Sequence, residues 1–305
     1  MFCCERISSI FFLLVVIGAN AKQYRPDYTY DRKLDAFYKF HIESVRHLLA
    51  EDICKIEGAK LMAPANDREI SLAHGMFKQF PDIVDFAWIG ENANGKESKE
   101  EHPLIDYSVD YREHFLHFRR NCDVLTRDGE VQSSDCYRRL PFFCKVDARD
   151  VFFDSKCKVY GKDYQFYENV GSCYKVPQIA YSWDQAYDEC YNEGSHLVIL
   201  NSELEHDVVH NITKTAPKLT GVRTSWSFYA GIRAPTPPEG KPVVFKTIFN
   251  QTLEEAGYSQ WSVNEPNNYD GLEYCGSIFK NDGKYNDLKC SHLYAFICEK
   301  EVKND

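Results

Sequence analysis

The cysteines constrain this chain more than any other feature of its sequence. Twelve are present among 305 residues, and Cys3 and Cys4 lie within the first 21 residues. The remaining ten are an even number, which in an exported chain indicates a framework of disulfides. No C-x-x-C pair occurs, so zinc-ribbon and thioredoxin-like sites lose support. The ten are Cys54, Cys122, Cys136, Cys144, Cys157, Cys173, Cys190, Cys275, Cys290 and Cys298.

The N-terminus predicts a signal peptide over residues 1–21, and therefore a secreted, extracellular protein. Arg6 precedes an apolar run from Ile10 to Ile17, and Ala19-Asn-Ala21 then matches a cleavage pattern. The run is too short to span a bilayer, and no other stretch approaches the ~20 apolar residues of a transmembrane helix. We expect no membrane insertion and no lipid anchor. The sequons at Asn211 and Asn250 predict N-glycosylation.

The spacing of the cysteines repeats along the chain. Cys136 and Cys144 enclose seven residues, as do Cys290 and Cys298, and an Asp-Gly pair precedes each of these two segments. Cys54 and Cys190 are each followed by glycine at the fourth position and leucine at the seventh. This repetition predicts two diverged copies of one unit. We place the first domain at 28–147, a charged linker at 148–156 and the second domain at 157–300.

Each copy shows a helix-then-strand pattern, which predicts an α+β fold with two helices and a small, mostly antiparallel sheet. Ser182 and Gln185 form a capping box that opens a helix, and Gly194 ends it. Ser202 and Asn66 have the same relation to a glutamate three residues later. The predicted helices cover 44–56, 71–77, 183–193 and 203–212, and the predicted strand covers 293–298.

Composition and motifs argue against two classes of function, nucleic-acid-binding proteins and enzymes. The net charge is −10 and the pI is near 5.5, which argues against nucleic-acid binding and is compatible with binding cations. His206 and His210 have the helical spacing of a zinc protease motif, but an aspartate replaces the glutamate base and no third ligand follows. We interpret this pair, and also His114 with His117, as exposed side chains. We predict no catalytic residues and no enzyme.

Together these features resemble the C-type lectin-like domain, over almost the whole chain after residue 21. The first copy carries G-A-K-L at 58–61, W-I-G at 88–90 and P-F-F-C at 141–144. The second copy carries W-x2-A-x3-C at 183–190, G-S-H-L at 194–197, Y-A-G at 229–231, W-x3-E-P-N at 261–267, E-x-C at 273–275, Y-N-D at 285–287 and F-I-C-E at 296–299.

The resemblance implies the disulfide pairing, which the residues alone leave open. Cys157–Cys173 would close the extra hairpin of the long form of the domain. The other implied pairs are Cys54–Cys144, Cys122–Cys136, Cys190–Cys298 and Cys275–Cys290.

The resemblance also implies one calcium ion in the second copy. Calcium takes six to eight oxygen ligands, and the Asp287 carbonyl would add one to the side chains. Two positions would then be left for neighbouring hydroxyls of a sugar. In the family, the peptide bond between the E and the P of E-P-N is cis. The side chains that would hold the metal are Glu265, Asn267, Glu273, Asn286 and Asp287.

The order E-P-N at 265–267 implies equatorial 3- and 4-hydroxyls, as in mannose, N-acetylglucosamine or fucose, whereas Q-P-D would imply galactose. The carboxylates would accept hydrogen bonds from these hydroxyls, and the amides would donate to them. The implied sugar-binding residues are Glu265, Asn267, Glu273 and Asn286.

Two positions depart from the family pattern. Tyr285 stands where the family has tryptophan, which keeps an aromatic ring beside the ligands. Asn268 and Tyr274 stand where some members have acidic residues of a second calcium site. We therefore expect one ion.

The first copy lacks the ligand set. Counted from its Asp-Gly pair, the Y-N-D positions are Val131, Gln132 and Ser133, and no E-P-N precedes Cys122. We expect neither calcium nor sugar there. A spacer, a protein-binding surface and a dimerisation unit all stay open.

Two classes of function follow. The first is a secreted, calcium-dependent lectin for mannose-type glycans or glycoproteins, with a role in innate immunity as one hypothesis. The second is an extracellular protein- or lipid-binding module that kept the fold but lost sugar binding. The intact ligand set favours the first.

Overall fold

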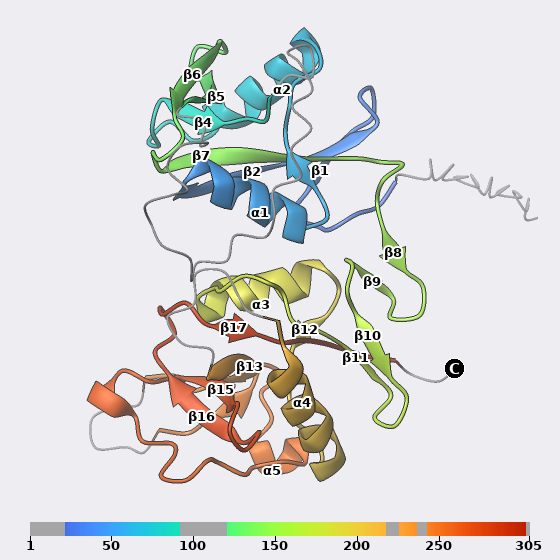
Figure 1. Cartoon of the computed structure of the whole chain (residues 1–305), viewed down its shortest axis with the longest axis vertical. Coiled ribbons are helices and arrows are strands. Elements are labelled where there is room, and N and C mark those ends of the chain that lie inside the picture. The colour runs from blue at the N-terminus through green and yellow to red at the C-terminus, as the bar shows by residue number, and fades with distance from the viewer. Residues whose placement is uncertain (1–21, 92–120, 218–225, 237–242, 303–305) are drawn as a thin grey trace, which may run out of the picture.

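The structure is a computed structural model that describes residues 22–91, 121–217, 226–236 and 243–302. They form two α+β units, one above the other in Figure 1, which we call the first unit (up to residue 147) and the second unit (from residue 157). The predicted signal peptide and the pair His114 and His117 lie outside the described residues.

The elements of the first unit are β1 (Thr29–Asp31), β2 (Ala36–Val45), α1 (His47–Ile56), β3 (Lys60–Leu61), α2 (Asp67–Lys78), β4 (Phe86–Trp88), β5 (Asn121–Thr126), β6 (Val131–Asp135) and β7 (Leu140–Asp147). Its sheet has the order β1-β2-β7-β4-β5-β6, and β3 also pairs with β7.

The second unit follows β8 (Phe153–Asp154), which lies in the predicted linker and pairs with β9. Its sheets have the orders β10-β11-β18-β12 and β14-β13-β15-β16, with β17 beside β13. Its elements are β9 (Val159–Tyr160), β10 (Gln165–Tyr167), β11 (Ser172–Lys175), α3 (Trp183–Asn192), β12 (His196–Leu197), α4 (Glu203–Thr215), β13 (Ser227–Arg233), β14 (Lys246–Thr247), α5 (Leu253–Ala256), the 3-10 helix η2 (Tyr269–Gly271), β15 (Cys275–Phe279), β16 (Tyr285–Leu288), β17 (Ala295–Phe296) and β18 (Cys298–Glu301).

Five disulfides close the two units, and they are the pairs that the resemblance implies. In each unit the longest one joins the first helix to the last strand, α1 to β7 and α3 to β18. These two bonds span 90 and 108 residues, and loop-closure entropy assigns about 4–5 kcal/mol to a loop of that length. The pairs are Cys54–Cys144, Cys122–Cys136, Cys157–Cys173, Cys190–Cys298 and Cys275–Cys290.

The two units repeat the same backbone contacts around these disulfides. The first N–H of α1, at His47, donates to the Cys136 carbonyl at 3.2 Å, and that of α3, at Trp183, donates to the Cys290 carbonyl at 2.9 Å. A Cβ on Gly90 would lie 2.7 Å from a backbone oxygen of β3, and one on Gly231 would lie 2.5 Å from a backbone oxygen of β12. Glycine is therefore required at the third position of W-I-G and of Y-A-G.

The structure confirms the three helix caps that the sequence predicts. Ser182 and Gln185 form both bonds of the capping box at α3, and Gly194 follows with φ of +87°. Ser202 and Asn66 each accept the N–H three residues later, at α4 and α2. α2 begins at Asp67, directly after its cap and before the predicted span of 71–77, and it ends at Lys78. α4 continues beyond the predicted end at 212 to Thr215.

The prediction of a helix over 44–56 is wrong at its start. Ser44 and Val45 belong to β2, and α1 begins at His47. Val45 pairs with Leu140 across the β2–β7 ladder, a long-range contact that the local helical period does not contain.

The buried face of α1 contains the disulfide cysteine. Ala50, Ile53 and Cys54 are buried, whereas Leu48 is 37% exposed. The disulfide turns Cys54 toward β7, so the residue one helical turn earlier faces the core with it.

The predicted strand 293–298 is two strands, because the chain changes sheets within it. β17 pairs with β13 in one sheet, and β18 pairs with β11 and β12 in the other. Ile297 lies between them and bonds to both sides, through the Tyr229 carbonyl and the Val198 N–H.

The two units meet through a buried group of charges beside α1 and α3, which face each other in Figure 1. The guanidinium of Arg25 is 1% exposed and donates two 2.9 Å hydrogen bonds to Glu189 on α3. It also lies 3.6 Å from Glu57, at the end of α1, and 3.8 Å from Glu193. Burial opposes its charge, but Glu189 and Glu57 outweigh burial and hold the pKa of Arg25 well above its usual value. One cation thus neutralises carboxylates of both units.

Replacing Arg25 with glutamine is expected to destabilise the protein by about 3–5 kcal/mol, because it removes the cation that binds the buried carboxylate of Glu189. Denaturant unfolding with the disulfides intact measures the change. The control is Arg149→Gln, whose side chain is 82% exposed beside Asp150 and whose loss should cost less than about 1 kcal/mol. Equal effects of the two variants would contradict this account of the interface.

Candidate metal and ligand site

The predicted ligands lie in one exposed loop and on the neighbouring strand of the second unit. Glu265, Asn267 and Glu273 belong to the loop between α5 and β15, and Asn286 and Asp287 belong to β16. The peptide bond between Glu265 and Pro266 is cis, as the resemblance implies. β16 pairs with β15, which places its ligands beside the end of the loop.

Hydrogen bonds connect the first part of the loop to Asp287. The carboxylate of Asp287, which is 1% exposed, accepts the N–H of Asn267 at 3.1 Å and of Asn268 at 2.8 Å. Glu265 accepts both the side-chain amide of Asn267, at 2.9 Å, and its backbone N–H, at 3.1 Å. The side-chain amide of Asn286 donates to the Asp287 carbonyl at 3.0 Å. Four of the five predicted ligands are thus in direct contact.

Glu273 reaches this group through Asn268, which the sequence analysis did not assign to the site. Asn268 accepts the N–H of Glu273 at 2.9 Å while its own N–H binds Asp287. The Glu273 carboxylate accepts the Tyr269 N–H at 3.1 Å. Asn268 adopts a φ of +45°, a conformation that asparagine tolerates better than most residues. This tolerance of asparagine for positive φ is the feature of the sequence that could have indicated a turn at Asn268.

The carboxylates of the site repel one another. Partial burial and the neighbouring Asp287 carboxylate raise the pKa of Glu265 to about 7. Burial also raises the pKa of Glu273, with Asp287 and Asp270 adding to the shift while the Tyr269 N–H and Lys289 oppose it. A cation placed among these three groups would relieve the repulsion.

The donor set suits a hard cation. It consists of carboxylate and amide oxygens, the ligands that calcium prefers, without sulfur or imidazole. Two oxygens bound to one calcium lie at most about 5 Å apart. Glu265, Glu273 and Asp287 are not among the groups with all ligand atoms within 4.8 Å of one another. No choice of one oxygen from each of these three carboxylates thus brings all three within 4.8 Å of one another.

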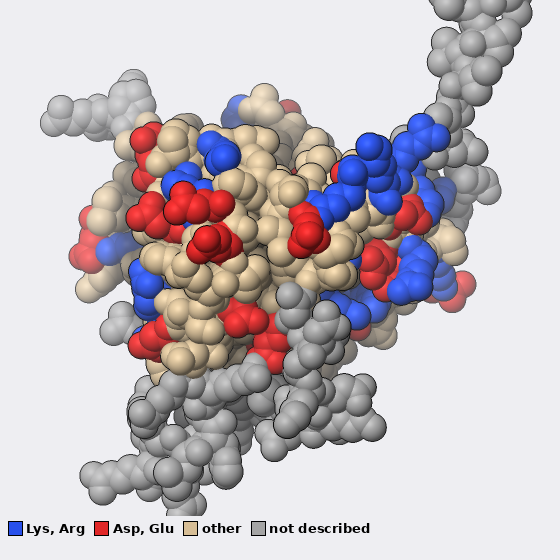
Figure 2. Space-filling view, turned by 90° about the horizontal axis from the view of Figure 1, so that it is seen from above, with Lys and Arg blue, Asp and Glu red and all other residues tan. Residues whose placement is uncertain are grey.

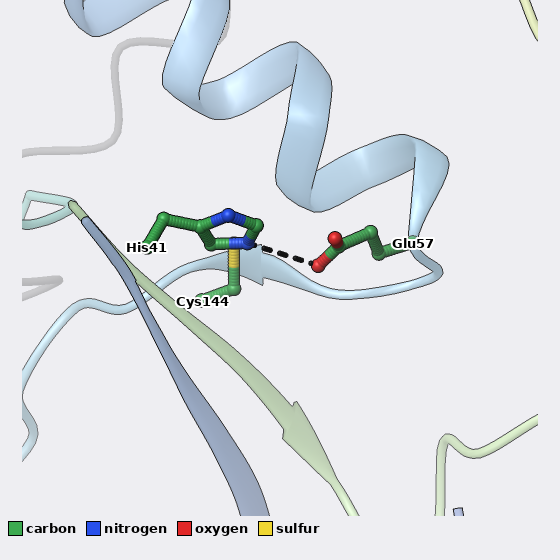
Figure 3. A group of neighbouring side chains, drawn as sticks. All are labelled: His41, Glu57 and Cys144. Atoms are coloured by element: carbon green, nitrogen blue, oxygen red, sulfur yellow. Dashed lines mark hydrogen bonds and ion pairs between the residues drawn. The ribbon is translucent and has the colours of Figure 1, made fainter. Parts of the chain in front are cut away.

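One group in the described part of the chain does meet the 4.8 Å distance, but it is not a metal site. It consists of His41, Glu57 and Cys144 in the first unit. Figure 3 shows the His41 ring turned toward Glu57, at 3.1 Å. The Cys144 sulfur is bonded to Cys54, and Glu57 already accepts hydrogen bonds from Tyr28 and Lys39. The sulfur and the carboxylate oxygens therefore already have bonding partners within the protein.

The corresponding strand of the first unit offers a different set of side chains. Val131, Gln132 and Ser133 lie on β6, directly after the Asp-Gly turn, as Tyr285 to Asp287 lie on β16. The segment before Cys122 that lacks E-P-N lies almost entirely outside the described residues.

His206 and His210 are not an exposed pair, so that interpretation is wrong. Both are part-buried, and their rings contact the β15–β16 turn, where His206 lies 2.9 Å from the Asp282 carbonyl and His210 lies 3.2 Å from that of Lys280. His206 also stacks on Tyr258. These contacts give the pair a structural role against the turn.

The structure bears on the predicted glycosylation sites, the surface charge and the absence of a membrane span. Asn211 on α4 and Asn250 in the turn after β14 are exposed. Figure 2 shows acidic and basic side chains side by side on the face seen from above. Across the described ranges, no helix has the length and the apolar character needed to cross a bilayer. The prediction that the chain does not bind nucleic acid stays a prediction.

Comparison with known proteins shows that the second unit is similar to a known domain. Residues 179–300 match the lectin C-type domain. Over 130 residues the chain is 36% identical to the hemolymph lipopolysaccharide-binding protein of Periplaneta americana, covering 42% of this chain and 49% of that protein. It is 31% identical over 140 residues to human asialoglycoprotein receptor 2, covering 44% of this chain and 39% of that receptor.

A weaker similarity extends over both units. Human C-type mannose receptor 2 is 23% identical over 295 residues, covering 88% of this chain and 18% of the receptor.

Among solved structures, the mouse scavenger receptor C-type lectin carbohydrate-recognition domain is 23% identical with a TM-score of 0.37, covering 47% of this chain and 98% of that domain. The chain spans about half or less of the length of these curated relatives.

These findings show a C-type lectin-like, α+β fold with five disulfides. Domains of this family generally bind calcium and are typically binding proteins rather than enzymes.

Tyr285 explains how this chain accommodates the absence of the family tryptophan. Its ring is fully buried and packs against Tyr258 and Trp261. Its hydroxyl oxygen accepts the N–H of Leu200 at 3.0 Å, which an indole N–H cannot do.

Tyr285→Phe is expected to destabilise the second unit by about 1–3 kcal/mol, because the buried Leu200 N–H loses its acceptor. Thermal or denaturant unfolding measures the loss. Tyr274→Phe is the matched control, since the Tyr274 hydroxyl bonds the Gly271 carbonyl at an exposed position, and it should change stability by less than about 0.5 kcal/mol. An unchanged stability in Tyr285→Phe would show that this bond contributes nothing.

Proposed function

We propose that this protein is a secreted lectin whose second unit binds one calcium ion and, through it, a sugar of the mannose, N-acetylglucosamine or fucose class. We further propose that the chain holds two tandem C-type lectin-like domains and that the first binds neither calcium nor sugar. Secretion and glycosylation at Asn211 and Asn250 belong to the same proposal.

The observation that carries the proposal is that Asn267, in an exposed loop, contacts both Glu265 of the same loop and Asp287 on β16. Asp287 is buried beneath the loop and holds its backbone in place. Glu265 and Asn267 are more exposed than Asp287, so they are accessible to both an ion and a sugar. A carboxylate and an amide in contact provide one acceptor and one donor for two neighbouring hydroxyls.

The name of one relative suggests a natural target. The cockroach protein, 36% identical, is named for binding lipopolysaccharide, which is a glycan attached to lipid. We include bacterial lipopolysaccharide among the glycans that the second unit recognises. A role in innate immunity rests on this suggestion alone.

Retention of the secreted chain on mannose resin in millimolar calcium is the first test. We expect retention that both a chelator and free mannose reverse. A single sugar site of this kind binds weakly, about −4 kcal/mol for a millimolar Kd, so dense display on the resin is needed to detect it. Asp287→Asn and Glu265→Ala should abolish retention, because each removes a carboxylate from the ion.

The matched control is Asp270→Asn in the same loop, where Asp270 pairs with Lys289 at 3.3 Å and is not a predicted ligand. It should bind as the parent does. Failure of the parent to bind any glycan resin would overturn the lectin proposal and favour the alternative of a protein- or lipid-binding module.

The class of sugar has its own test. The double variant Glu265→Gln, Asn267→Asp replaces E-P-N with Q-P-D, the order that the family resemblance associates with galactose. We expect retention to move from mannose resin to galactose resin. Unchanged preference for mannose would show that these two side chains do not select the sugar.

A further inference from the structure

Each unit buries one glutamate of its second helix against a tyrosine of the sheet. Glu69 on α2 accepts the Tyr38 hydroxyl at 2.7 Å and the Ala65 N–H at 2.6 Å. Glu205 on α4 accepts the hydroxyl of Tyr174, and its second oxygen accepts the Asn201 N–H at 2.7 Å. Both glutamates are 1% exposed or less, so each charge has to be neutralised or hydrogen-bonded.

The units differ in the residue that faces this glutamate. In the first unit Lys145, directly after the last cysteine, donates to Glu69 at 2.5 Å. In the second unit Glu299 follows the last cysteine. The strand registers match, since Tyr38 lies opposite Lys145 and Tyr174 lies opposite Glu299. A cation in one unit is thus replaced by a second carboxyl group in the other.

Glu299 is fixed in this position by hydrogen bonds. It is 1% exposed, accepts the Ser172 hydroxyl at 3.0 Å and the Ile199 N–H at 3.1 Å, and lies close to Glu205. Both acids lie at Tyr174, which is opposite Glu299 in the ladder and donates to Glu205. Two buried carboxyl groups this close repel each other when both are ionised, which favours the state in which one of them carries a proton.

One short segment, 199–201, binds Glu205, Glu299 and also β16, the strand that carries two of the predicted ligands. Ile199, Leu200 and Asn201 donate their successive N–H groups to Glu299, to the Tyr285 hydroxyl and to Glu205. The acid pair therefore lies at the base of the segment that anchors β16.

The other titratable groups around the pair do not supply a cation. His196 lies opposite Glu299 on β12, and burial lowers its pKa. Burial raises the pKa of Tyr174 and of Tyr285, so both keep their protons. On the strand of Glu299 itself, the Lys300 ammonium binds the Gly194 carbonyl at 2.7 Å, and Glu301 is exposed.

We propose that Glu205 and Glu299 share one proton in the folded second unit, and that this proton makes the stability of the second unit, but not of the first, fall as the pH rises. In the first unit the ammonium of Lys145 takes the place of that proton. The proposal concerns the folding of the second unit and holds whether or not the unit binds calcium or sugar.

The direction of the pH effect follows from linkage. Burial and the neighbouring Glu205 raise the pKa of Glu299 well above its usual value. An unfolded glutamate releases its proton near pH ~4.3. The contribution is therefore complete below that pH and is lost as the pH rises toward the folded pKa. Binding one proton more in the folded state changes the unfolding constant about tenfold per pH unit.

The test compares the parent with Glu299→Gln by urea unfolding at fixed ionic strength, between about pH 5 and about pH 8. Glutamine has the shape of the protonated acid, and with its carbonyl oxygen on the Ile199 N–H its amide can donate to Glu205 and to the Ser172 oxygen, but it holds no titratable proton. Three of the four tryptophans, Trp183, Trp226 and Trp261, lie in the second unit, so fluorescence follows mainly this unit. We expect the ratio of the two unfolding constants to change about tenfold per pH unit. A ratio that is independent of pH would overturn the proposal.

A second measurement does not depend on any variant folding. A buried protonated carboxyl gives an infrared carbonyl band that carboxylates lack, and we expect this band in the parent at about pH 8, where Glu265, whose pKa is about 7, has mostly lost its proton. Its absence would also overturn the proposal. Glu299→Lys, which copies the first unit, should lose the band and the pH slope while retaining the fold; persistence of both would place the proton elsewhere.

Discussion

The second unit depends on the disulfide that joins Cys190 in α3 to Cys298 at the start of β18. This bond holds the last strand between β11 and β12, and the chain has to cross from the other sheet at Ile297 to reach it. The crossing brings Glu299 next to Glu205 and places Tyr285 against Leu200. The shorter disulfide, Cys275–Cys290, then closes the hairpin whose strand carries the ligands. The candidate site therefore lies on a framework fixed by covalent bonds, whereas Glu265, Asn267 and Glu273 lie in a loop outside it.

Buried charge is used in three different ways in this molecule. At the contact between the units, Arg25 is surrounded by acids and the ion pairs satisfy one another. Beneath β16, two acids face each other, and we infer a shared proton. In the exposed loop, the acids repel one another, as the raised pKa of Glu265 indicates, and we propose calcium as the missing cation. Each solution follows from the cost of burying an uncompensated charge.

Short sequence motifs predicted the features that depend on residues close together in the chain. The caps of α2, α3 and α4, the glycine that ends α3 and the set of candidate ligands were all readable from short motifs. The start of α1 was not, because Val45 joins β2 through a partner 95 positions later, Leu140. Nor was Arg25, whose partner Glu189 is 164 residues away. The contact of Glu299 with Glu205 and the role of Asn268 depend on the fold, since only the strand register and the loop conformation bring those groups together.

The most direct test of the central claim is a calorimetric titration of the intact protein with calcium, with and without methyl mannoside. The account predicts one ion per chain, tighter binding of that ion in the presence of the sugar, and loss of the signal in Asp287→Asn. Two ions per chain, or one ion that still binds to Asp287→Asn, would place calcium outside the loop of the second unit and contradict the account.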